Sequence, residues 1–129
     1  MRDGDPTAPA PRAPTVLVVD DHDGFRKRMR RLLERHGYRV FEAADGAGAI
    51  VSATRRVPDI ALLDVHLPDM DGFAVAHGLR RGGMLGAILL ISTHAEDDYL
   101  ERIRTSSADG FINKADLSIE TITAMLATS

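Results

Sequence analysis

Apolar and polar residues alternate in two different rhythms along the chain. Residues 15–19 (Thr-Val-Leu-Val-Val) form a short, continuous, β-branched run, which is typical of a strand that is buried on both faces. The next segment carries apolar residues at the spacing of a single helix face, and Gly37 ends it. The apolar residues of that face are Phe25, Met29, Leu32 and Leu33.

The same alternation repeats four more times along the chain. Further strands are expected over residues 38–43, 60–63, 87–91 and 110–112, and further helices over residues 46–56, 73–81, 96–106 and 117–127. Strands that alternate with helices predict a parallel α/β sheet that is covered on both faces and connected by right-handed crossovers. Ligands of such sheets bind outside the carboxyl ends of the strands, so the residues there are candidates for a site.

Polar residues of complementary chemistry follow four of the five expected strands. Asp20 and Asp21 follow the first strand, Asp64 the third, Ser92 the fourth and Lys114 the fifth. Three carboxylates at one edge would repel each other, and a hard divalent cation with oxygen ligands, Mg²⁺ or Mn²⁺, would relieve that repulsion. A metal ion, a carboxylate nucleophile, a hydroxyl and an ammonium together suit phosphoryl chemistry.

Each of these residues alone has an ordinary structural explanation. A pair of aspartates after a strand most often caps the next helix, and Asp64 would be a turn residue. A serine at a strand end usually bonds the nearby backbone, and a single lysine such as Lys114 is usually a solvated cation. The functional interpretation is favoured because these residues occur together at four strand ends of the same edge.

Composition limits the class of protein. A chain of 129 residues with 44% hydrophobic residues fits one folded domain, expected over 15–129, after a proline- and alanine-rich leader (1–14) that is expected to be disordered or extended. The absence of cysteine excludes disulfides, thiol catalysis and thiolate metal sites. No apolar run approaches the roughly 20 residues of a membrane span, and no signal peptide is recognisable. The expected location is therefore the cytoplasm, with no membrane contact.

Positive charge is concentrated in one expected helix. The net charge is −3, and residues 26–35 nevertheless contain six cations and one anion. A solvated helix face is the favoured interpretation of this run, and docking to an acidic face of a partner is the alternative. Direct nucleic-acid contact by this domain is not expected, because interleaved aromatic residues are missing.

Four motifs, in this order and spacing, resemble the receiver domain of bacterial two-component response regulators. They are Val-Leu-Val-Val-Asp-Asp-His (16–22), Leu-Leu-Asp-Val-His-Leu-Pro-Asp-Met-Asp-Gly (62–72), Leu-Ile-Ser-Thr-His (90–94) and Ala-Asp-Gly-Phe-Ile-Asn-Lys (108–114). The resemblance covers nearly the whole chain after residue 14. It implies the flavodoxin-like, doubly wound, five-stranded parallel sheet with strand order 2-1-3-4-5 and five helices.

The resemblance also implies roles for the residues at the strand ends. Asp64 would be the phosphoacceptor, which takes a phosphoryl group from a phosphohistidine on a sensor histidine kinase or a phosphotransfer protein. Asp21 would ligate Mg²⁺ (or Mn²⁺) directly and Asp20 mainly through water, and Asp64 and the backbone carbonyl of His66 would complete the protein ligands. Lys114 would bind a phosphoryl oxygen. Phosphotransfer and dephosphorylation would be self-catalysed, so the domain is not classed as an enzyme.

A conformational switch belongs to the same resemblance. Ser92 would move to hydrogen-bond the phosphoryl group, and the ring of Phe111 would turn inward in response. Phosphorylation would then favour the active arrangement of the face formed by the fourth helix, the fifth strand and the fifth helix. Exposed charges on the fourth helix permit a homodimer through this face.

The sequence departs from the family pattern near this site. Lys114 is followed by Ala115 where most relatives have proline and a cis peptide, and Ser107 replaces a usual glycine. Thr93 is larger than the common alanine or glycine, and with His66 and His94 it is expected to alter autodephosphorylation. The favoured interpretation of these two histidines themselves is as exposed loop residues. No histidine of the chain has a partner at the spacing of a metal site, so zinc is not expected.

Other functions remain open at this stage. The chain is interpreted as a stand-alone receiver or the receiver of a longer regulator, and the stretch 92–100 resembles receivers attached to LuxR-type helix-turn-helix DNA-binding domains. A pseudo-receiver, a phosphorylation-independent interaction module, is the main alternative. A Mg²⁺-dependent phosphatase with an aspartyl nucleophile ranks last, because His66 stands where such enzymes have a second aspartate.

Overall fold

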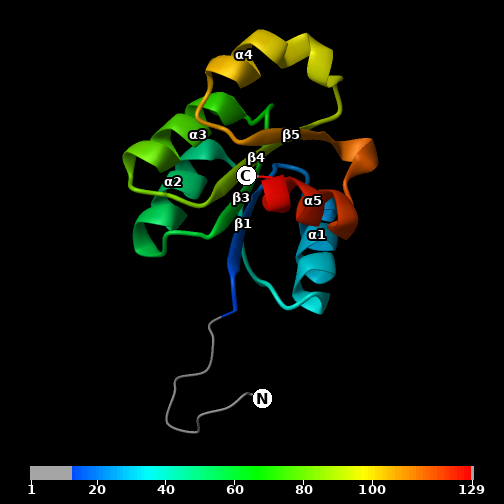
Figure 1. The fold of residues 1–129 in the computed structure, drawn as a ribbon. Helices are drawn as coiled ribbons and strands as arrows, with labels where there is room; N and C mark the ends of the chain where they lie inside the picture. Colours follow the sequence, from blue (N-terminus) through cyan, green and yellow to red (C-terminus); the bar gives the residue numbers. More distant parts are fainter. Residues whose placement is uncertain (1–12, 129) are drawn as a thin grey trace, which may run out of the picture.

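The computed structural model describes residues 13–128, so nearly all of the expected leader (1–14) lies outside the described residues. Five parallel strands form one sheet in the order β2-β1-β3-β4-β5 (Figure 1). The strands are β1 (Thr15–Val19), β2 (Arg39–Ala43), β3 (Ile60–Asp64), β4 (Ala87–Ser92) and β5 (Gly110–Asn113). The expected strand order and the doubly wound fold class are confirmed.

Five α-helices and two short 3₁₀ helices connect these strands. They are α1 (Asp23–Arg35), α2 (Gly46–Arg55), α3 (Gly72–Arg81), α4 (Leu100–Thr105), α5 (Ile119–Thr128), η1 (Glu96–Tyr99) and η2 (Lys114–Asp116). α1 and α5 lie on one side of the sheet, and α2 and α3 on the other (Figure 1). No helix within the described range 13–128 has the length and apolar character that a membrane crossing requires.

The core is divided by the sheet into two layers. Met29 and Leu33 of α1 and Ile122 of α5 pack on one face of the sheet, against residues such as Val18 and Leu62. Residues of α2 and α3, together with the partly buried Tyr99 and Ile103, pack on the other. Every residue of β1 and β3 is buried, because helices cover both faces of these central strands, as their continuous apolar runs predict.

Two expected helices begin later than the sequence pattern indicates. The fourth was expected as a single helix over 96–106, but it starts with the 3₁₀ turn η1 and becomes α-helical only at Leu100. Tyr99, with φ −127° and ψ 6°, breaks the α-helical geometry between them. The last helix was expected from residue 117 and starts at Ile119, where the Ser118 hydroxyl accepts a hydrogen bond from the Thr121 backbone N–H at 3.1 Å.

The two unusual backbone positions of the sequence are regular in the structure. The Lys114–Ala115 peptide is trans, as are all peptide bonds among the described residues. Ser107 has a negative φ, and positive φ values among the described residues occur only at Gly37 and Gly83. Gly37, with φ +91°, ends α1, as the sequence pattern predicts.

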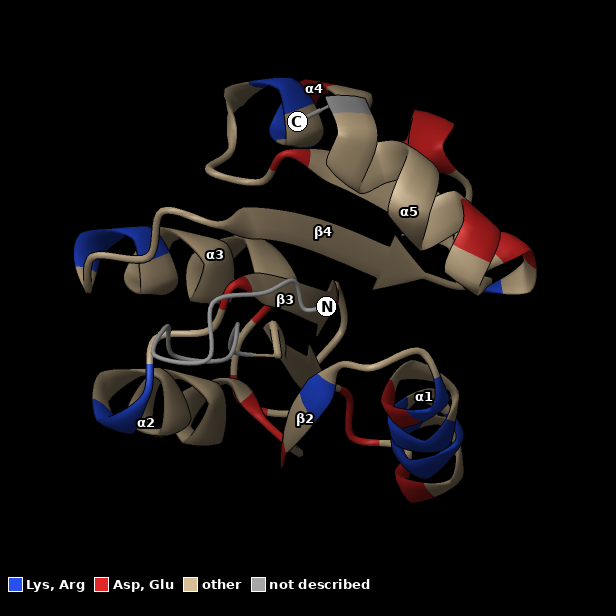
Figure 2. Cartoon of the chain, turned by 60° about the horizontal axis from the view of Figure 1, so that its bottom comes forward, with Lys and Arg blue, Asp and Glu red and all other residues tan. Residues whose placement is uncertain are grey.

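The cations of α1 are not all solvated, so the favoured interpretation of this run is wrong for its inner face. The helix is densely covered with basic residues (Figure 2), yet Arg26 is only 8% exposed. Its guanidinium donates to Glu42 Oε1 of β2 at 2.8 Å and to the Asp20 carbonyl oxygen at 2.7 Å. Arg30 also donates to the Glu42 carboxylate. This cluster fastens α1 to the sheet and supports the backbone at the end of β1.

We predict that Glu42→Gln destabilises the fold in a pH-dependent manner. Partial burial alone would raise the pKa of the Glu42 carboxyl, but hydrogen bonds from Arg26 and Arg30 hold this pKa below its ordinary value. The contribution of the ionised Glu42 carboxylate to the free energy of unfolding is therefore complete above about pH 4.3, the ordinary glutamate pKa. It is lost as the pH falls through the lower pKa of the folded state. The variant is expected to lose about 1.5–3 kcal/mol in urea unfolding at pH 7, and this difference should shrink in acid.

The matched control for that prediction is Glu34→Gln. Glu34 also pairs with Arg30, at 3.2 Å, but both side chains are exposed to solvent. An exposed pair contributes about 0.5 kcal/mol or less, so the control should unfold nearly as the wild type does. A loss for Glu42→Gln that is equal at all pH values would contradict the ionic origin of the effect.

Candidate functional site

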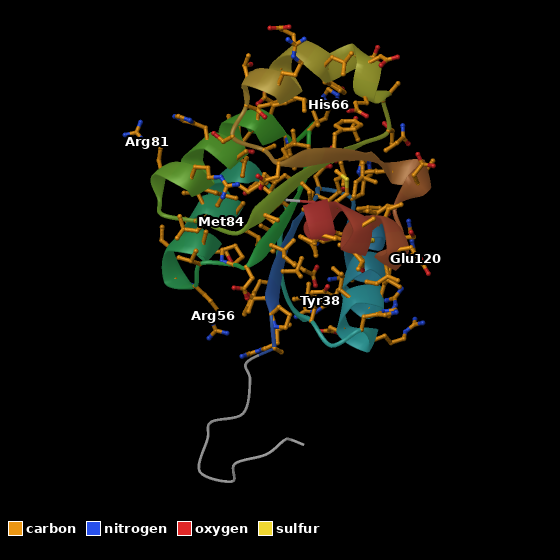
Figure 3. All side chains as sticks on the ribbon, viewed as in Figure 1. Tyr38, Arg56, His66, Arg81, Met84 and Glu120 are labelled. Carbon is orange, nitrogen blue, oxygen red and sulfur yellow. The ribbon has the colours of Figure 1, made fainter. Side chains whose placement is uncertain are left out.

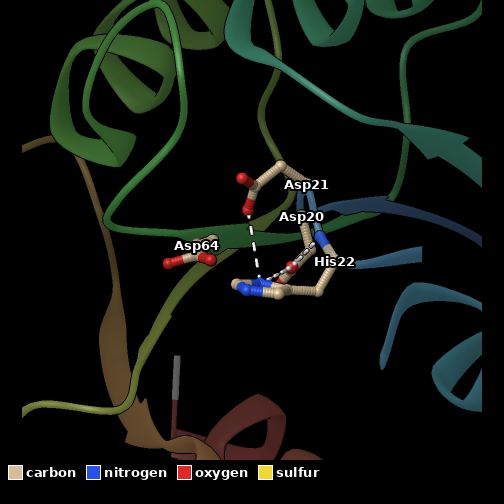
Figure 4. Close-up of side chains that lie close together, drawn as sticks. All are labelled: Asp20, Asp21, His22 and Asp64. Carbon is tan, nitrogen blue, oxygen red and sulfur yellow. Dashed lines mark hydrogen bonds and ion pairs between the residues drawn. The ribbon is translucent and has the colours of Figure 1, made fainter. Parts of the chain in front are cut away.

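The predicted site residues meet at one edge of the sheet because β1 and β3 are neighbours in register. Val19 pairs with Leu63, so the residues that follow them, Asp20 and Asp64, lie side by side. Asp21 lies in the loop before α1, close to Asp20 and Asp64 (Figure 4). Lys114 reaches the same edge from the end of β5. The structure therefore brings together the carboxylates and the ammonium that the sequence placed at separate strand ends.

Asp20 is completely buried at the bottom of this site. Its Oδ1 accepts a hydrogen bond from the His22 backbone N–H at 2.8 Å. Its Oδ2 lies 2.7 Å from Lys114 Nζ in an ion pair, but accepts no hydrogen bond of regular geometry within the described part of the chain. A buried carboxylate oxygen in this condition is poorly compensated and favours an additional cation nearby.

Asp64, at the end of β3, is only 4% exposed. Its Oδ1 accepts from the His66 backbone N–H at 2.9 Å, and its Oδ2 lies 3.2 Å from Lys114 Nζ. Burial raises the pKa of the Asp64 carboxyl, and the neighbouring Asp20 raises it further, against the opposing effects of the His66 N–H and Lys114. The folded site thus disfavours the charged form of this buried carboxyl.

Lys114 is the cation that holds this site together. Burial would lower the pKa of its ammonium, but Asp20 and Asp64 raise it above the ordinary value, so the group stays charged. Lys114 Nζ also lies 4.5 Å from the centre of the Phe25 ring, which covers it from α1. The compact ammonium thus contacts two carboxylates and one aromatic face.

The loop that follows Asp64 is fixed at two points. Asp69 accepts hydrogen bonds from the Gly46 and Ala47 backbone N–H groups, which anchors the loop to the start of α2. At Gly72 a Cβ atom would lie 2.5 Å from the Asp64 carbonyl oxygen, so only glycine permits this close approach. Gly72, the last residue of the second motif, therefore has a direct structural purpose.

The acidic residues are arranged to fit a divalent metal ion. One ligand atom from each of Asp20, Asp21, His22 and Asp64 lies within 4.8 Å of the others. The carboxylate oxygens suit a hard cation, and the poorly compensated Asp20 Oδ2 is consistent with one. His22 belongs to this group, although the sequence predicted no histidine at the spacing of a zinc site. The missed signal was its position directly after the two aspartates.

The two expected switch residues, Ser92 and Phe111, lie on β4 and β5. Ser92 is completely buried at the end of β4, and its Oγ accepts from the His94 backbone N–H at 3.0 Å. Phe111 is 8% exposed, so its ring is turned inward, and it contacts the Tyr99 ring at 5.8 Å. Thr93 is exposed next to Ser92. The Phe111 ring is thus already turned inward while Ser92 bonds the His94 N–H, whereas the resemblance implies that the ring turns inward when Ser92 moves; the switch role of these two residues stays a prediction.

Tyr99 is a site neighbour that the sequence analysis missed. His66 and His94 are exposed, as expected, but their rings lie 5.0 Å apart, and His66 Nε2 lies 2.6 Å from the Tyr99 hydroxyl. His66 thereby lies beside the segment formed by η1 and α4 (Figure 3). Tyr99 also contacts Phe73 and Phe111. Tyr99 is the last residue of η1, and the simple helical pattern did not indicate that its ring would lie beside the loop after β3.

A second link joins the Asp64 loop to α4. Asp71 pairs with Arg102 at 2.6 Å, and this guanidinium lies 4.2 Å from the centre of the Phe73 ring. The Arg102 hydrogen bond, opposing the effect of partial burial, holds the pKa of the Asp71 carboxyl below its ordinary value. Together with the His66–Tyr99 contact, this pair connects α4 to the segment that follows Asp64.

Comparison with known proteins identifies a consistent set of relatives. The family model described as "Response regulator receiver domain" matches residues 16–127. The chain is 38% identical over 120 residues to "Probable transcriptional regulatory protein NarL" of Mycobacterium tuberculosis, which covers 92% of this chain and 56% of that protein. It is 34% identical over 99 residues to "KDP operon transcriptional regulatory protein KdpE" of Escherichia coli, covering 77% of this chain and 44% of that protein. The chain thus spans about half the length of these curated relatives.

Solved structures give the same result. The signal receiver domain of the putative response regulator NarL from Mycobacterium tuberculosis superposes with a TM-score of 0.79 at 36% identity, covering 92% of this chain and 97% of that chain. A LuxR-family two-component response regulator from Aurantimonas sp. SI85-9A1 has a TM-score of 0.79 at 31% identity, covering 91% and 87%. The chemotaxis protein CheY4 of Vibrio cholerae has a TM-score of 0.81 at 28% identity, covering 91% and 98%.

Proposed function

The chain belongs to the response regulator receiver domain family of two-component signalling, and from that premise we propose that Asp64 is its phosphoacceptor. The observation that carries this proposal is the position of Asp64, a buried carboxylate that meets Asp20 and Lys114 at the carboxyl edge of the sheet. The chain has all the site residues that the resemblance implies, which argues against the pseudo-receiver alternative; they are Asp20, Asp21, Asp64, Ser92 and Lys114. His66 stands where an aspartyl phosphatase would have its second aspartate, which argues against that enzyme class.

The residues around Asp64 suit phosphoryl transfer. An Asp64 oxygen attacks the phosphorus of a phosphohistidine, so that a P–O bond forms while the P–N bond breaks and the imidazole leaves. Lys114, already 3.2 Å from Asp64 Oδ2, would pair with a phosphoryl oxygen. Ser92 would exchange its bond with the His94 N–H for one to a second phosphoryl oxygen.

A divalent ion completes this arrangement. The domain has the acidic pocket at which receiver domains bind such ions. Asp20, Asp21, Asp64 and the backbone carbonyl of His66 would hold Mg²⁺ or Mn²⁺, which neutralises charge on the phosphoryl oxygens when bound. Because Asp64 is consumed and regenerated as part of the chain itself, we class the domain as a self-catalysed phosphoacceptor and not as an enzyme.

A kinase or phosphotransfer protein is the proposed donor. A groove beside Lys114 is lined by Phe25, Arg28 and Leu32 of α1 and by Ala115 and Leu117 after β5. An acidic, partly apolar helical surface that bears the phosphohistidine would fit this groove. The proposed location is the cytoplasm, where such donors present their phosphohistidine, with no membrane or direct nucleic-acid contact by this domain.

The output proposed for the domain is control of a transcription regulator. Relatives such as NarL and KdpE are named transcriptional regulatory proteins, and this chain matches about half of each. Phosphorylation would change the α4–β5–α5 face, where Phe111 is buried beneath Tyr99, and a homodimer through this face would transmit the change.

Metal-dependent phosphorylation tests the proposal directly. The purified chain is incubated with Mg²⁺ and acetyl phosphate and examined by intact-mass analysis, with fragmentation to locate the modification. One phosphoryl group on Asp64 is expected, and EDTA in place of Mg²⁺ should prevent its appearance. No adduct in the presence of Mg²⁺ would favour the pseudo-receiver instead.

A further prediction concerns the lifetime of the aspartyl phosphate. Thr93 lines the same groove as Lys114 and is exposed next to Ser92. We expect its side chain to limit the approach of water to the aspartyl phosphate. Thr93→Ala is expected to shorten the phosphate half-life severalfold, measured as loss of the adduct after removal of acetyl phosphate. Thr105→Ala, an exposed change on α4, is the control. An unchanged half-life for Thr93→Ala would refute this role.

A further inference from the structure

The acidic pocket contains one nitrogen donor in addition to its carboxylates. His22 Nδ1 lies 3.2 Å from Asp20 Oδ1 and 3.3 Å from Asp21 Oδ1, on the solvent side of the pocket (Figure 4). We propose that His22 is a ligand of the metal ion through Nδ1 and that it makes the site prefer first-row transition ions over Mg²⁺. This inference rests on the metal site of the proposed function and goes beyond it, because it assigns the site's ion selectivity to a residue.

The spacing of the donor atoms fits a shared ion. Two ligands at right angles on an ion with bonds of about 2.1 Å lie about 3.0 Å apart. The distances from His22 Nδ1 to the two carboxylate oxygens are close to that value. Only a small adjustment of the ring would therefore place an ion against the nitrogen and both carboxylates.

The local fold holds His22 in this position. Its backbone N–H donates to Asp20 Oδ1 at 2.8 Å, which closes the loop between β1 and α1. His22 is the N-cap residue of α1, yet its side chain makes no capping hydrogen bond to the helix. The ring is thus directed to the carboxylates and not to the helix end, where a capping residue normally directs its side chain.

The pocket sets three aspartates against one ammonium, Lys114, whose Nζ lies 2.7 Å from Asp20 Oδ2 and 3.2 Å from Asp64 Oδ2. Asp20 is completely buried, and its Oδ2 accepts no hydrogen bond of regular geometry within residues 13–128. The His22 side chain is 72% exposed, so an ion could be bound through it without burying the ring. The pocket is therefore closed on the Asp20 side and open on the His22 side.

The chemical consequence is a change of preference among ions. Mg²⁺ takes oxygen ligands almost exclusively, so an imidazole nitrogen adds little to its binding. The same nitrogen strengthens the binding of Mn²⁺ modestly and that of Co²⁺ substantially. A site with His22 as a ligand should thus bind Co²⁺ more tightly than its carboxylates alone would, and a site without His22 should lose that advantage but keep Mg²⁺.

Calorimetric titration of the metal-free chain with Mg²⁺, Mn²⁺ and Co²⁺ tests the proposal. His22→Ala is expected to weaken Co²⁺ binding by about tenfold or more, while Mg²⁺ binding changes less than about twofold. His77→Ala, an exposed histidine on α3, should bind all three ions as the wild type does. Equal losses for Co²⁺ and Mg²⁺, or none for either, would overturn the assignment.

A spectroscopic measurement on the unaltered chain guards against a variant that fails to fold. Electron spin echo modulation of bound Mn²⁺ should contain a nitrogen coupling that changes when histidine is labelled with ¹⁵N. Its absence would overturn the role of His22 even if Asp64 is phosphorylated with Mg²⁺. A nitrogen coupling in a chain that acetyl phosphate does not modify would instead overturn the phosphoacceptor role and leave the His22 ligand in place.

Discussion

Asp64→Asn is expected to abolish the phosphoryl adduct that acetyl phosphate and Mg²⁺ produce on the wild type. The amide has nearly the shape of the carboxylate, but it lacks the anionic oxygen that attacks phosphorus, so the nucleophile is lost without a cavity. The remaining aspartates of the pocket are differently placed: Asp20 is completely buried. Intact-mass analysis of the variant should therefore show only the unmodified chain.

The control for this loss is Asp97→Asn. Asp97 is an exposed carboxylate in η1, and its replacement should leave the adduct at the wild-type level. An adduct of wild-type size on Asp64→Asn would place the phosphoacceptor elsewhere and would remove the basis of the proposed function.

The same variant should also change the stability of the metal-free protein. Burial and the nearby Asp20 raise the pKa of the Asp64 carboxyl, which means that its charged form is disfavoured in the folded state. Replacement by a neutral amide removes that penalty, so Asp64→Asn should melt at a higher temperature than the wild type in EDTA at pH 7. Mg²⁺ should then raise the melting temperature of the wild type more than that of the variant.

The strands and the site edge could be predicted because both depend on local sequence. A central parallel strand is buried on both faces, so Thr15–Val19 appears as one continuous apolar run. The end of such a run also marks the edge of the sheet. The sequence therefore predicted Asp20 and Asp64 at the same edge, and the pairing of β1 with β3 brings them side by side. Predicted strand ends differ from the observed ones by one residue at most, as with β3, which includes Asp64, whereas the start of α4 differs by four.

The contacts that the sequence could not indicate join segments whose distance depends on the packed fold. Arg26 looks like one more solvated cation of α1, and only the position of β2 brings Glu42 beside it. His22 Nδ1 faces the carboxylates because of the turn between β1 and α1, a matter of backbone geometry and not of residue spacing. Tyr99 reaches His66 only because η1 is not α-helical.

These missed contacts have one consequence for signalling. His66 and Asp71 lie on the loop after Asp64, and their partners Tyr99 and Arg102 lie on η1 and α4. The loop therefore contacts η1 and α4 directly, in parallel with the proposed route through Ser92 and Phe111. A phosphoryl group on Asp64 would act on both routes, because the first includes His66, two residues after Asp64, and the second starts at Ser92, next to Ile91, which pairs with Asp64.

Lys114→Ala is expected to slow phosphorylation by acetyl phosphate about 10²–10³-fold, the usual effect of removing one fixed donor to developing negative charge. The ammonium lies 2.7 Å from Asp20 Oδ2 and 3.2 Å from Asp64 Oδ2, so its loss leaves two buried carboxylates without their internal cation. The rate is measured as the appearance of the adduct over time, and thermal melts in Mg²⁺ establish that the variant is folded.

Lys27→Ala is the matched control, because Lys27 and Lys114 are the only lysines of the chain. Lys27 is exposed on α1 and lies 3.6 Å from Glu42, away from Asp64, so its variant should react at the wild-type rate. Lys114→Arg separates charge from shape: the planar guanidinium keeps the charge but cannot reproduce the compact contact with both carboxylates, so it should restore only part of the rate. A wild-type rate for Lys114→Ala would mean that Lys114 supports the fold and not the transfer, and the pocket would then rely on its metal ion alone.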